Sequence, residues 1–290
     1  MKSWLLILGS LCAAAAYAQP PFLPGFPETM PPDATGGTLM RGVPASNLPG
    51  ASHHGGGSVN LIDHGGRILP VSKIYYIWWG PGGWPSDAKS GLTALATGLT
   101  GSAFMSDIFP QYMRGAGTPT TSLVASFADT SAPPAKNPST SAIINEACKV
   151  IGSGAVDPSA LYVVLTSNFP SNVNYCAWHA WGKCANSTTE IQVAYMPNTA
   201  GVQGCVDPVL TCGTYSQGTQ SIANVLSHEF SESITDADGS AWYDQSGSEI
   251  GDKCAWQFAS CVNLKNGSSW QLQMEWSNAA NGGKGACIQQ

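Results

Sequence analysis

The sequence predicts a single α/β domain, in which helices cover a mixed sheet, followed by an irregular C-terminal part held by disulfides. Two observations lead to this fold class. Runs of β-branched and aromatic residues alternate with segments in which apolar residues recur every three to four positions, and the series ends in a long amphipathic helix. The remainder of the chain, from residue 253 on, is rich in Trp and Cys and has no regular apolar period.

The first 58 residues are expected to lie outside that domain. Residues 1–18 have the pattern of a signal peptide, because a Lys precedes an apolar run and Ala16-Tyr17-Ala18 offers the small residues that signal peptidase accepts. The run is shorter than the about 20 residues needed to span a membrane. Residues 19–58 are rich in Pro and Gly and are interpreted as a flexible leader or propeptide. The domain then occupies residues 59–290.

The series of elements begins with "KIYYIWWG", which reads as a buried strand closed by Gly-Pro-Gly-Gly. A helix follows, with Ser86 as its expected N-cap and with Leu92, Leu95 and Leu99 on one face. A second helix ends near Gly152. Strands are expected at 73–80, 122–129, 160–167 and 191–198, and helices at 86–104, 139–154 and 219–234.

The composition excludes some classes of partner. Charged residues make up 10% of the chain, against about 25% in an ordinary soluble domain. The net charge of −6 leaves no basic stripe, so we expect no nucleic acid partner. No apolar stretch after the signal peptide is long enough to cross a bilayer, so we expect a secreted monomer without a membrane span. Sequons at Asn186 and Asn266 permit glycosylation.

Eight cysteines remain once Cys12 leaves with the signal peptide, and an even number in an exported chain indicates disulfides. No C-x-x-C spacing occurs, which argues against a zinc site built from cysteines. Three pairs of cysteines are close in sequence, and we expect these local loops to be disulfides. The expected pairs are Cys176 with Cys184, Cys205 with Cys212, Cys254 with Cys261 and, as the remaining two, Cys148 with Cys287.

Acidic residues are concentrated in one stretch of a chain that has few of them. Of 18 acidic residues, seven lie between positions 229 and 252, with no Lys or Arg among them before Lys253. On the helix expected at 219–234, His228 and Glu232 project side by side at one edge of the apolar arc. Glu229 falls inside that arc, where an ion without a partner is costly. Such a position calls for a compensating partner.

The spacing H-E-x-x-E supplies a partner if a metal is bound. In H-E-x-x-H zinc enzymes the first and fifth residues hold the ion, and the Glu in second place is the general base. By this logic His228 and Glu232 are candidate zinc ligands and Glu229 is the candidate base. A third ligand is expected from Glu249 or Asp252, which lie 17 and 20 positions beyond Glu232. The other of these two would then accept the ring N–H of His228.

Two alternatives to a zinc site stay open at this level. His228 and Glu232 also fit an ordinary i, i+4 charge pair, which stabilises a helix by about 0.2–0.5 kcal/mol. The acids from 236 to 249 also fit an irregular calcium loop, although Gly239 and Glu249 do not fall at the EF-hand positions. The acids that we expect to serve the turns of this loop are Asp236, Asp238 and Asp244.

The stretch "VLSHEFSESITDADGSAWYDQSGSEIGDKCAW" resembles the signature of the Exordium-like, or phosphate-induced protein, family of secreted proteins. The segments "HGGRILPVSKIYYIWWG", "YCAWHAWGKC" and "EWSNAANGG" extend the resemblance over about residues 64–287. Two features depart from the family pattern. Ala237 stands where the family has Pro, and the cysteine spacing around His179 differs. His179, between Trp178 and Trp181, fits either a site residue or a stacked surface histidine, and we favour the stacked surface histidine.

The resemblance implies a zincin-like domain and an extracellular or wall-associated protein, without specifying an activity. With the H-E-x-x-E helix, it leads us to expect a zinc-dependent hydrolase of peptide or related acyl bonds, with Glu229 as general base and Tyr243 as an electrophilic helper. The alternative is a non-catalytic extracellular or cell-wall-associated interaction or signalling protein on the same scaffold. The expected partner is an extracellular peptide, protein or cell-wall component.

Overall fold

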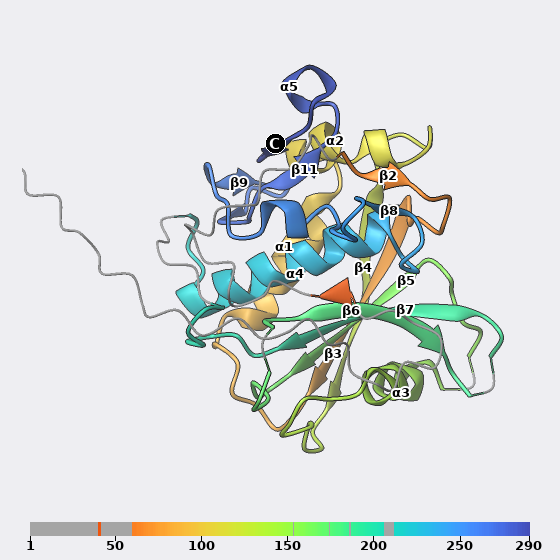
Figure 1. The fold of residues 1–290 in the computed structure, drawn as a ribbon. Helices are drawn as coiled ribbons and strands as arrows, with labels where there is room; N and C mark the ends of the chain where they lie inside the picture. Colours follow the sequence, from red (N-terminus) through yellow and green to blue (C-terminus); the bar gives the residue numbers. More distant parts are fainter. Residues whose placement is uncertain (1–39, 42–59, 153, 174, 186, 206–211) are drawn as a thin grey trace, which may run out of the picture.

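The computed structural model describes residues 40–41, 60–152, 154–173, 175–185, 187–205 and 212–290, and it is built around a mixed sheet (Figure 1). The predicted signal peptide and nearly all of the predicted leader lie outside the described residues. The sheet has six strands in the order β1-β6-β7-β5-β3-β4. These strands are β1 (Met40–Arg41), β3 (Val71–Trp79), β4 (Thr120–Asp129), β5 (Ala160–Thr166), β6 (Trp178–Lys183) and β7 (Glu190–Pro197).

Strands β4, β3, β5 and β7 run parallel, and β6 and β1 continue the sheet in antiparallel pairings. Every residue of β5 is buried, as expected for a central parallel strand covered on both faces. The four predicted strands are confirmed, with ends that shift by one or two residues. Strand β6 was missed, because "WHAWGK" mixes Trp and His with Gly and Lys and has no clean alternation.

The two faces of the sheet carry different helices (Figure 1). Helix α3 (Thr140–Ile151) packs against β5, β6 and β7 on one face. Helices α1 (Ala88–Leu99) and α4 (Gln217–Thr235) pack together on the other, where α1 contacts β4 and α4 contacts β6 and β7. Each face therefore has its own hydrophobic core.

The single helix predicted at 86–104 is two helices in the structure. The chain leaves α1 after Leu99, and the Ser102 side chain caps α2 (Ala103–Ile108) by accepting a hydrogen bond from the Met105 amide. The expected N-cap of α1 was also wrong, because Asp87 rather than Ser86 stands there. The Asp87 carboxylate instead accepts hydrogen bonds from the backbone of Ser216, at the start of α4.

Helix α4 is enclosed on all sides. Every residue from Thr219 to Thr235 is buried, so the apolar arc predicted from periodicity is only one of its covered faces. The polar face tolerates burial partly because its hydroxyls donate to helix carbonyls, as Ser231 does to Ser227 at 2.7 Å and Ser233 to Glu229 at 2.6 Å. The carboxylates on this face cannot donate to helix carbonyls in this way when they are ionised, so they need partners from other segments.

The C-terminal part, which covers the polar face of α4, consists of short elements. Its two-stranded ladders join β9 to β10 and β11 to β12, while β2, from the start of the domain, pairs with β8. The remaining elements are β2 (Ile62–Asp63), η1 (Pro110–Tyr112), β8 (Trp242–Tyr243), η2 (Asp252–Cys254), β9 (Val262–Asn263), β10 (Ser269–Trp270), β11 (Glu275–Ser277), α5 (Ala280–Gly283) and β12 (Ala286–Ile288).

Four disulfides are present, but all four predicted pairings were wrong. Strand β6 separates Cys176 from Cys184, and its six extended residues span about 20 Å, whereas bonded cysteines have Cα atoms within about 7 Å. Closeness in sequence therefore predicts the wrong partner here, because an extended strand places Cys176 and Cys184 far apart. The observed pairs are Cys148–Cys184, Cys176–Cys205, Cys212–Cys261 and Cys254–Cys287.

Four disulfides are typical of a protein that folds in an oxidising compartment, which agrees with the expected export. Within the described ranges, no helix has the length and the apolar character that a membrane crossing requires.

We predict that replacing Cys254 and Cys287 by Ser lowers the free energy of unfolding by about 4 kcal/mol, because the bond closes a 33-residue separation. The same change should weaken metal binding, since this disulfide anchors η2, which begins at Asp252. The matched control replaces Cys148 and Cys184, which close a similar separation of 36 residues beside α3. Denaturant titration and metal titration of both variants check this. Equal metal affinity in the two variants would contradict it.

Candidate metal centre

A cluster of buried ionisable side chains lies where α4, β6 and the loop before η2 meet. Two groups of three residues each bring ligand atoms within 4.8 Å of one another. One group is His228, Glu232 and Asp252, and the other is His179, Glu232 and Glu249. Glu232 belongs to both groups. The cluster is therefore formed by three segments that are distant in sequence.

The first group matches the predicted ligand set with Asp252 as its third member. His228 Nε2 lies 3.1 Å from Glu232 Oε1 and 3.8 Å from Asp252 Oδ1. Ligand atoms of a tetrahedral zinc site are about 3.3 Å apart when the bonds to zinc are about 2.0–2.1 Å long. His228 Nε2 makes no hydrogen bond of normal geometry within the described part of the chain. His228 Nε2 thus lies close to two carboxylate oxygens without forming a hydrogen bond to either, as expected for ligand atoms that face a common ion.

The other ring nitrogen of His228 faces a residue that the sequence did not single out. Gln273 Nε2 lies 2.9 Å from His228 Nδ1 and also donates to the Gly251 carbonyl at 3.0 Å. We had expected Glu249 or Asp252 at this nitrogen. The amide nitrogen of Gln273 can only donate, so in this arrangement His228 Nδ1 accepts and the neutral ring carries its proton on Nε2. For Nε2 to bind a metal, Gln273 would have to turn its side-chain amide so that Oε1 accepts from Nδ1–H. Gly251 is required for this packing, because a Cβ there would lie 2.7 Å from His228 Nδ1.

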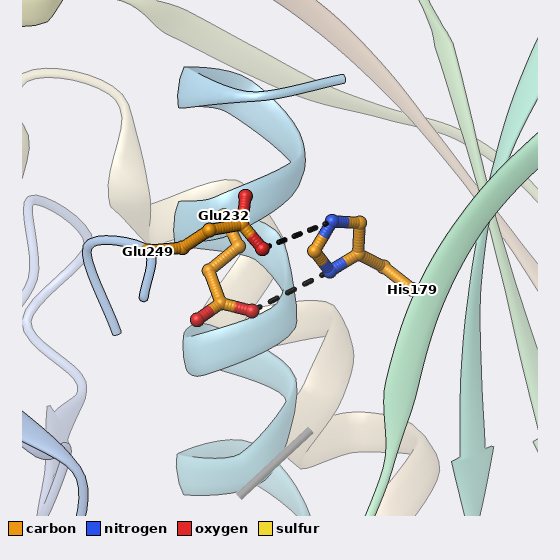
Figure 2. Close-up of side chains that lie close together, drawn as sticks. All are labelled: His179, Glu232 and Glu249. Carbon is orange, nitrogen blue, oxygen red and sulfur yellow. Dashed lines mark ion pairs between the residues drawn. The ribbon is translucent and has the colours of Figure 1, made fainter. Parts of the chain in front are cut away.

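The second group contains His179, which was wrongly interpreted as a surface histidine. His179 is 1% exposed and points from β6 toward α4. Figure 2 shows two carboxylates on the same side of its ring, each facing a different ring nitrogen. Nδ1 lies 3.4 Å from Glu232 Oε2, and Nε2 lies 3.7 Å from Glu249 Oε2. The flanking Trp residues suggested stacking, and only the position of β6 beside α4 reveals the contact.

Glu229 is fully buried, as its position in the apolar arc predicted. Its Oε2 lies 3.2 Å from His179 Nδ1, while its Oε1 has no hydrogen-bond partner among the described residues. Tyr243 lies farther along the chain in β8, where its ring stacks on His64 at 3.8 Å. No contact between Tyr243 and the cluster is seen among the described residues, and its role as an electrophilic helper stays a prediction.

The loop acids serve turns, as predicted. Asp236 Oδ1 accepts a hydrogen bond from the Ala241 amide, and Asp238 and Asp244 accept from nearby backbone and side-chain donors. Burial raises the pKa of Asp236 to about 6. Glu275, on β11, was missed altogether. It is fully buried, both of its oxygens lack hydrogen-bond partners among the described residues, and burial raises its pKa well above the usual value.

Crowding of charges in a dry site shifts the other pKa values. Burial opposes the charged form of His179, but hydrogen bonds to Glu229 and Glu232 outweigh it and raise the pKa of His179 to about 9. Burial, reinforced by repulsion from Glu232, raises the pKa of Asp252 to about 8 and that of Glu249 well above its usual value. Despite burial, the two histidines lower the pKa of Glu232 to about 2. A divalent cation would relieve this repulsion.

Comparison of the chain with protein-family models, with curated proteins and with solved structures gave no match. The case for a function therefore depends on the site itself.

We predict that the metal-free protein loses stability as pH rises from 5 to 8. A carboxyl with a raised pKa in the folded state stabilises it at low pH, and this stabilisation is lost as pH rises through the folded-state pKa. Asp236, whose pKa shifts from 3.8 to about 6, contributes about 3 kcal/mol of loss in total as pH rises from about 4 to above 6, and about 1.4 kcal/mol of it falls between pH 5 and 8. Asp252, Glu249 and His179 act in the same direction, whereas Glu232 matters only in acid.

Denaturant titrations in EDTA at several pH values measure this dependence. Asp236→Asn should flatten the curve between pH 4 and 6, and Asp238→Asn, two residues along in the same turn, serves as the control. A free energy of unfolding that rises between pH 5 and 8 in EDTA would show that the buried acids are compensated in another way.

Proposed function

We propose that this chain is a secreted zinc-dependent hydrolase of peptide or related acyl bonds on a zincin-like scaffold. The observation that carries the proposal is the set of unpaired buried ligand atoms around α4. His228 Nε2, Glu232 Oε2 and Glu229 Oε1 are buried without hydrogen-bond partners in the described structure. A stable fold leaves such atoms unpaired when a bound group completes them. His228 and Glu232 form a possible metal site together with Asp252, and one imidazole with two carboxylates is a donor set that zinc accepts. The unpaired oxygen of Glu229 is left for the attacking water.

In this proposal His228, Glu232 and Asp252 would hold the ion. Zinc bound there would lower the pKa of water toward about 7 and polarise the substrate carbonyl. Glu229 takes the proton from the attacking water and passes it to the leaving group. Burial raises the pKa of Glu229, which favours a base that works near neutral pH. Gln273 holds the His228 ring in place through Nδ1.

A pairing at the edge of the sheet supports a peptide as the substrate class. Met40 and Arg41, from the predicted leader, pair in antiparallel fashion with His179 and Trp178 of β6. An extended chain thus lies along the strand that carries His179. A peptide substrate bound as an additional strand would use the same backbone hydrogen bonds.

The Exordium-like resemblance adds to the proposal only through the residues that carry it. Its motif falls on His228, Glu229, Glu232, Glu249 and Asp252, and all five of these side chains lie in the cluster. The non-catalytic alternative uses the same metal site as a structural element. Glu229 discriminates between the two functions, because only the hydrolase requires a base.

We predict that the purified domain contains zinc, that His228→Ala loses it, and that Glu229→Gln keeps it. Glu229→Gln should lower the rate of cleavage of fluorescently labelled casein by about 10²–10⁴-fold, because general-base catalysis contributes about that factor. Metal analysis and the casein assay give both readouts. The control is Glu190→Gln, a half-exposed carboxylate that pairs with Lys183 at the surface.

If the Glu229→Gln variant cleaves casein at the wild-type rate, Glu229 is not the general base. Stoichiometric zinc in a wild-type protein that cleaves no peptide would favour the non-catalytic alternative. Absence of zinc from the wild-type protein, after purification without chelators, would overturn the site.

A further inference from the structure

Glu232 stands between two histidines and presents one carboxylate oxygen to each of them. Its Oε1 lies 3.1 Å from His228 Nε2, and its Oε2 lies 3.4 Å from His179 Nδ1. A single zinc held by His228 and Asp252 would be nearest to Oε1, which also accepts a hydrogen bond from the Asp252 amide at 3.1 Å, and would leave Oε2 without a partner. The carboxylate thus has the arrangement of a bridge between two sites.

The residues on the far side are left without partners by a single ion. Glu249 is fully buried, and both of its oxygens lack hydrogen-bond partners within the described part of the chain. The same holds for His179 Nε2, which points at Glu249 across 3.7 Å (Figure 2). Buried carboxylate oxygens and imidazole nitrogens that lack partners lose their hydration without replacement, which costs stability.

The number of buried carboxyl groups in the cluster also exceeds what one divalent ion could coordinate together with the histidines. Five carboxylates of the region are fully buried, and that of Asp252 is 23% exposed. Among the described residues, no Lys or Arg forms an ion pair with any of the six. Lys253 is adjacent in sequence, but its Nζ lies 2.8 Å from Asp244 and over the Trp276 ring. The fully buried carboxylates are Glu229, Glu232, Asp236, Glu249 and Glu275.

We propose that the cluster binds two divalent metal ions that share Glu232 as a bridging ligand. One ion is held by His228, Asp252 and Glu232 Oε1, and the other by His179, Glu249 and Glu232 Oε2. The imidazole and carboxylate donors suit zinc or manganese. Two-metal sites in hydrolases hold their ions about 3.5–4 Å apart, a separation that one bridging carboxylate spans. The inference rests on the proposed function for the first ion and adds the second.

The second ion also assigns a role to His179. If His179 is a ligand, one of its ring nitrogens binds the metal and the other stays available for a hydrogen bond. Its Nδ1 is the atom nearest to Glu229 Oε2, at 3.2 Å. The second site therefore lies beside the proposed general base, and its loss should impair catalysis as well as metal content.

Metal content measured by mass spectrometry on the intact domain, loaded with excess zinc and then desalted, tests the proposal. We expect two zinc ions per wild-type chain and one in each of His179→Ala, Glu249→Gln and His228→Ala. The control Glu190→Gln should keep two. One ion in the wild type that His179→Ala leaves in place and His228→Ala removes would overturn the second site and leave the proposed function intact. No ion in the wild type would overturn both.

A measurement on the unaltered chain guards against variants that fail to fold. Cobalt(II) loaded into the metal-free wild-type protein at two equivalents should give the electron paramagnetic resonance spectrum of a spin-coupled pair, because a shared carboxylate couples adjacent ions. At one equivalent the signal should be that of isolated cobalt. Two equivalents of bound cobalt that stay magnetically isolated would contradict the Glu232 bridge.

Discussion

The burial of carboxylates around α4 is the constraint on which the rest of this structure depends. Glu229 and Glu232 are fully enclosed, and each lies against an imidazole rather than an ammonium or guanidinium group. Neutral imidazoles cannot balance this charge, and protonated ones balance only part of it. Because an uncompensated buried ion costs several kcal/mol, the fold is consistent with a cation at its centre.

The architecture around α4 encloses the helix on all sides. The sheet covers the apolar arc, and the C-terminal part covers the polar face through bonds to side chains that are spaced along the helix. Gln220 accepts from the Gln271 amide and Asn224 from the Gln273 amide, so one extended segment is held along the helix. The Cys254–Cys287 bond then ties η2 to the end of the chain. The C-terminal part thus brings Asp252 and Gln273 to the cluster and shields the polar face of α4 from solvent.

The cluster consists of two groups of possible ligands that share Glu232, and its chemistry depends on both groups. The residues on α4 and η2 form one of the two groups that could hold a metal, and β6 brings His179 within 3.2 Å of Glu229, the proposed base. Strand β6 also accepts an extended segment at its outer edge. In the proposed hydrolase, the substrate backbone, the base and the metal would all be positioned relative to one strand and one helix.

Features that depend on local periodicity could be predicted from the sequence alone. The regular strands, α3, α4, the burial of Glu229 and the proximity of His228 to Glu232 all follow from spacing along a strand or a helix. Tertiary structure decided the disulfide pairs, β6, and the contacts of His179 and Gln273 with residues 50 and 45 positions away. It also placed Asp252 beside His228 and Glu249 beside His179, since a loop's course depends on what it packs against. Contacts between distant segments arise from packing, and no local pattern encodes them.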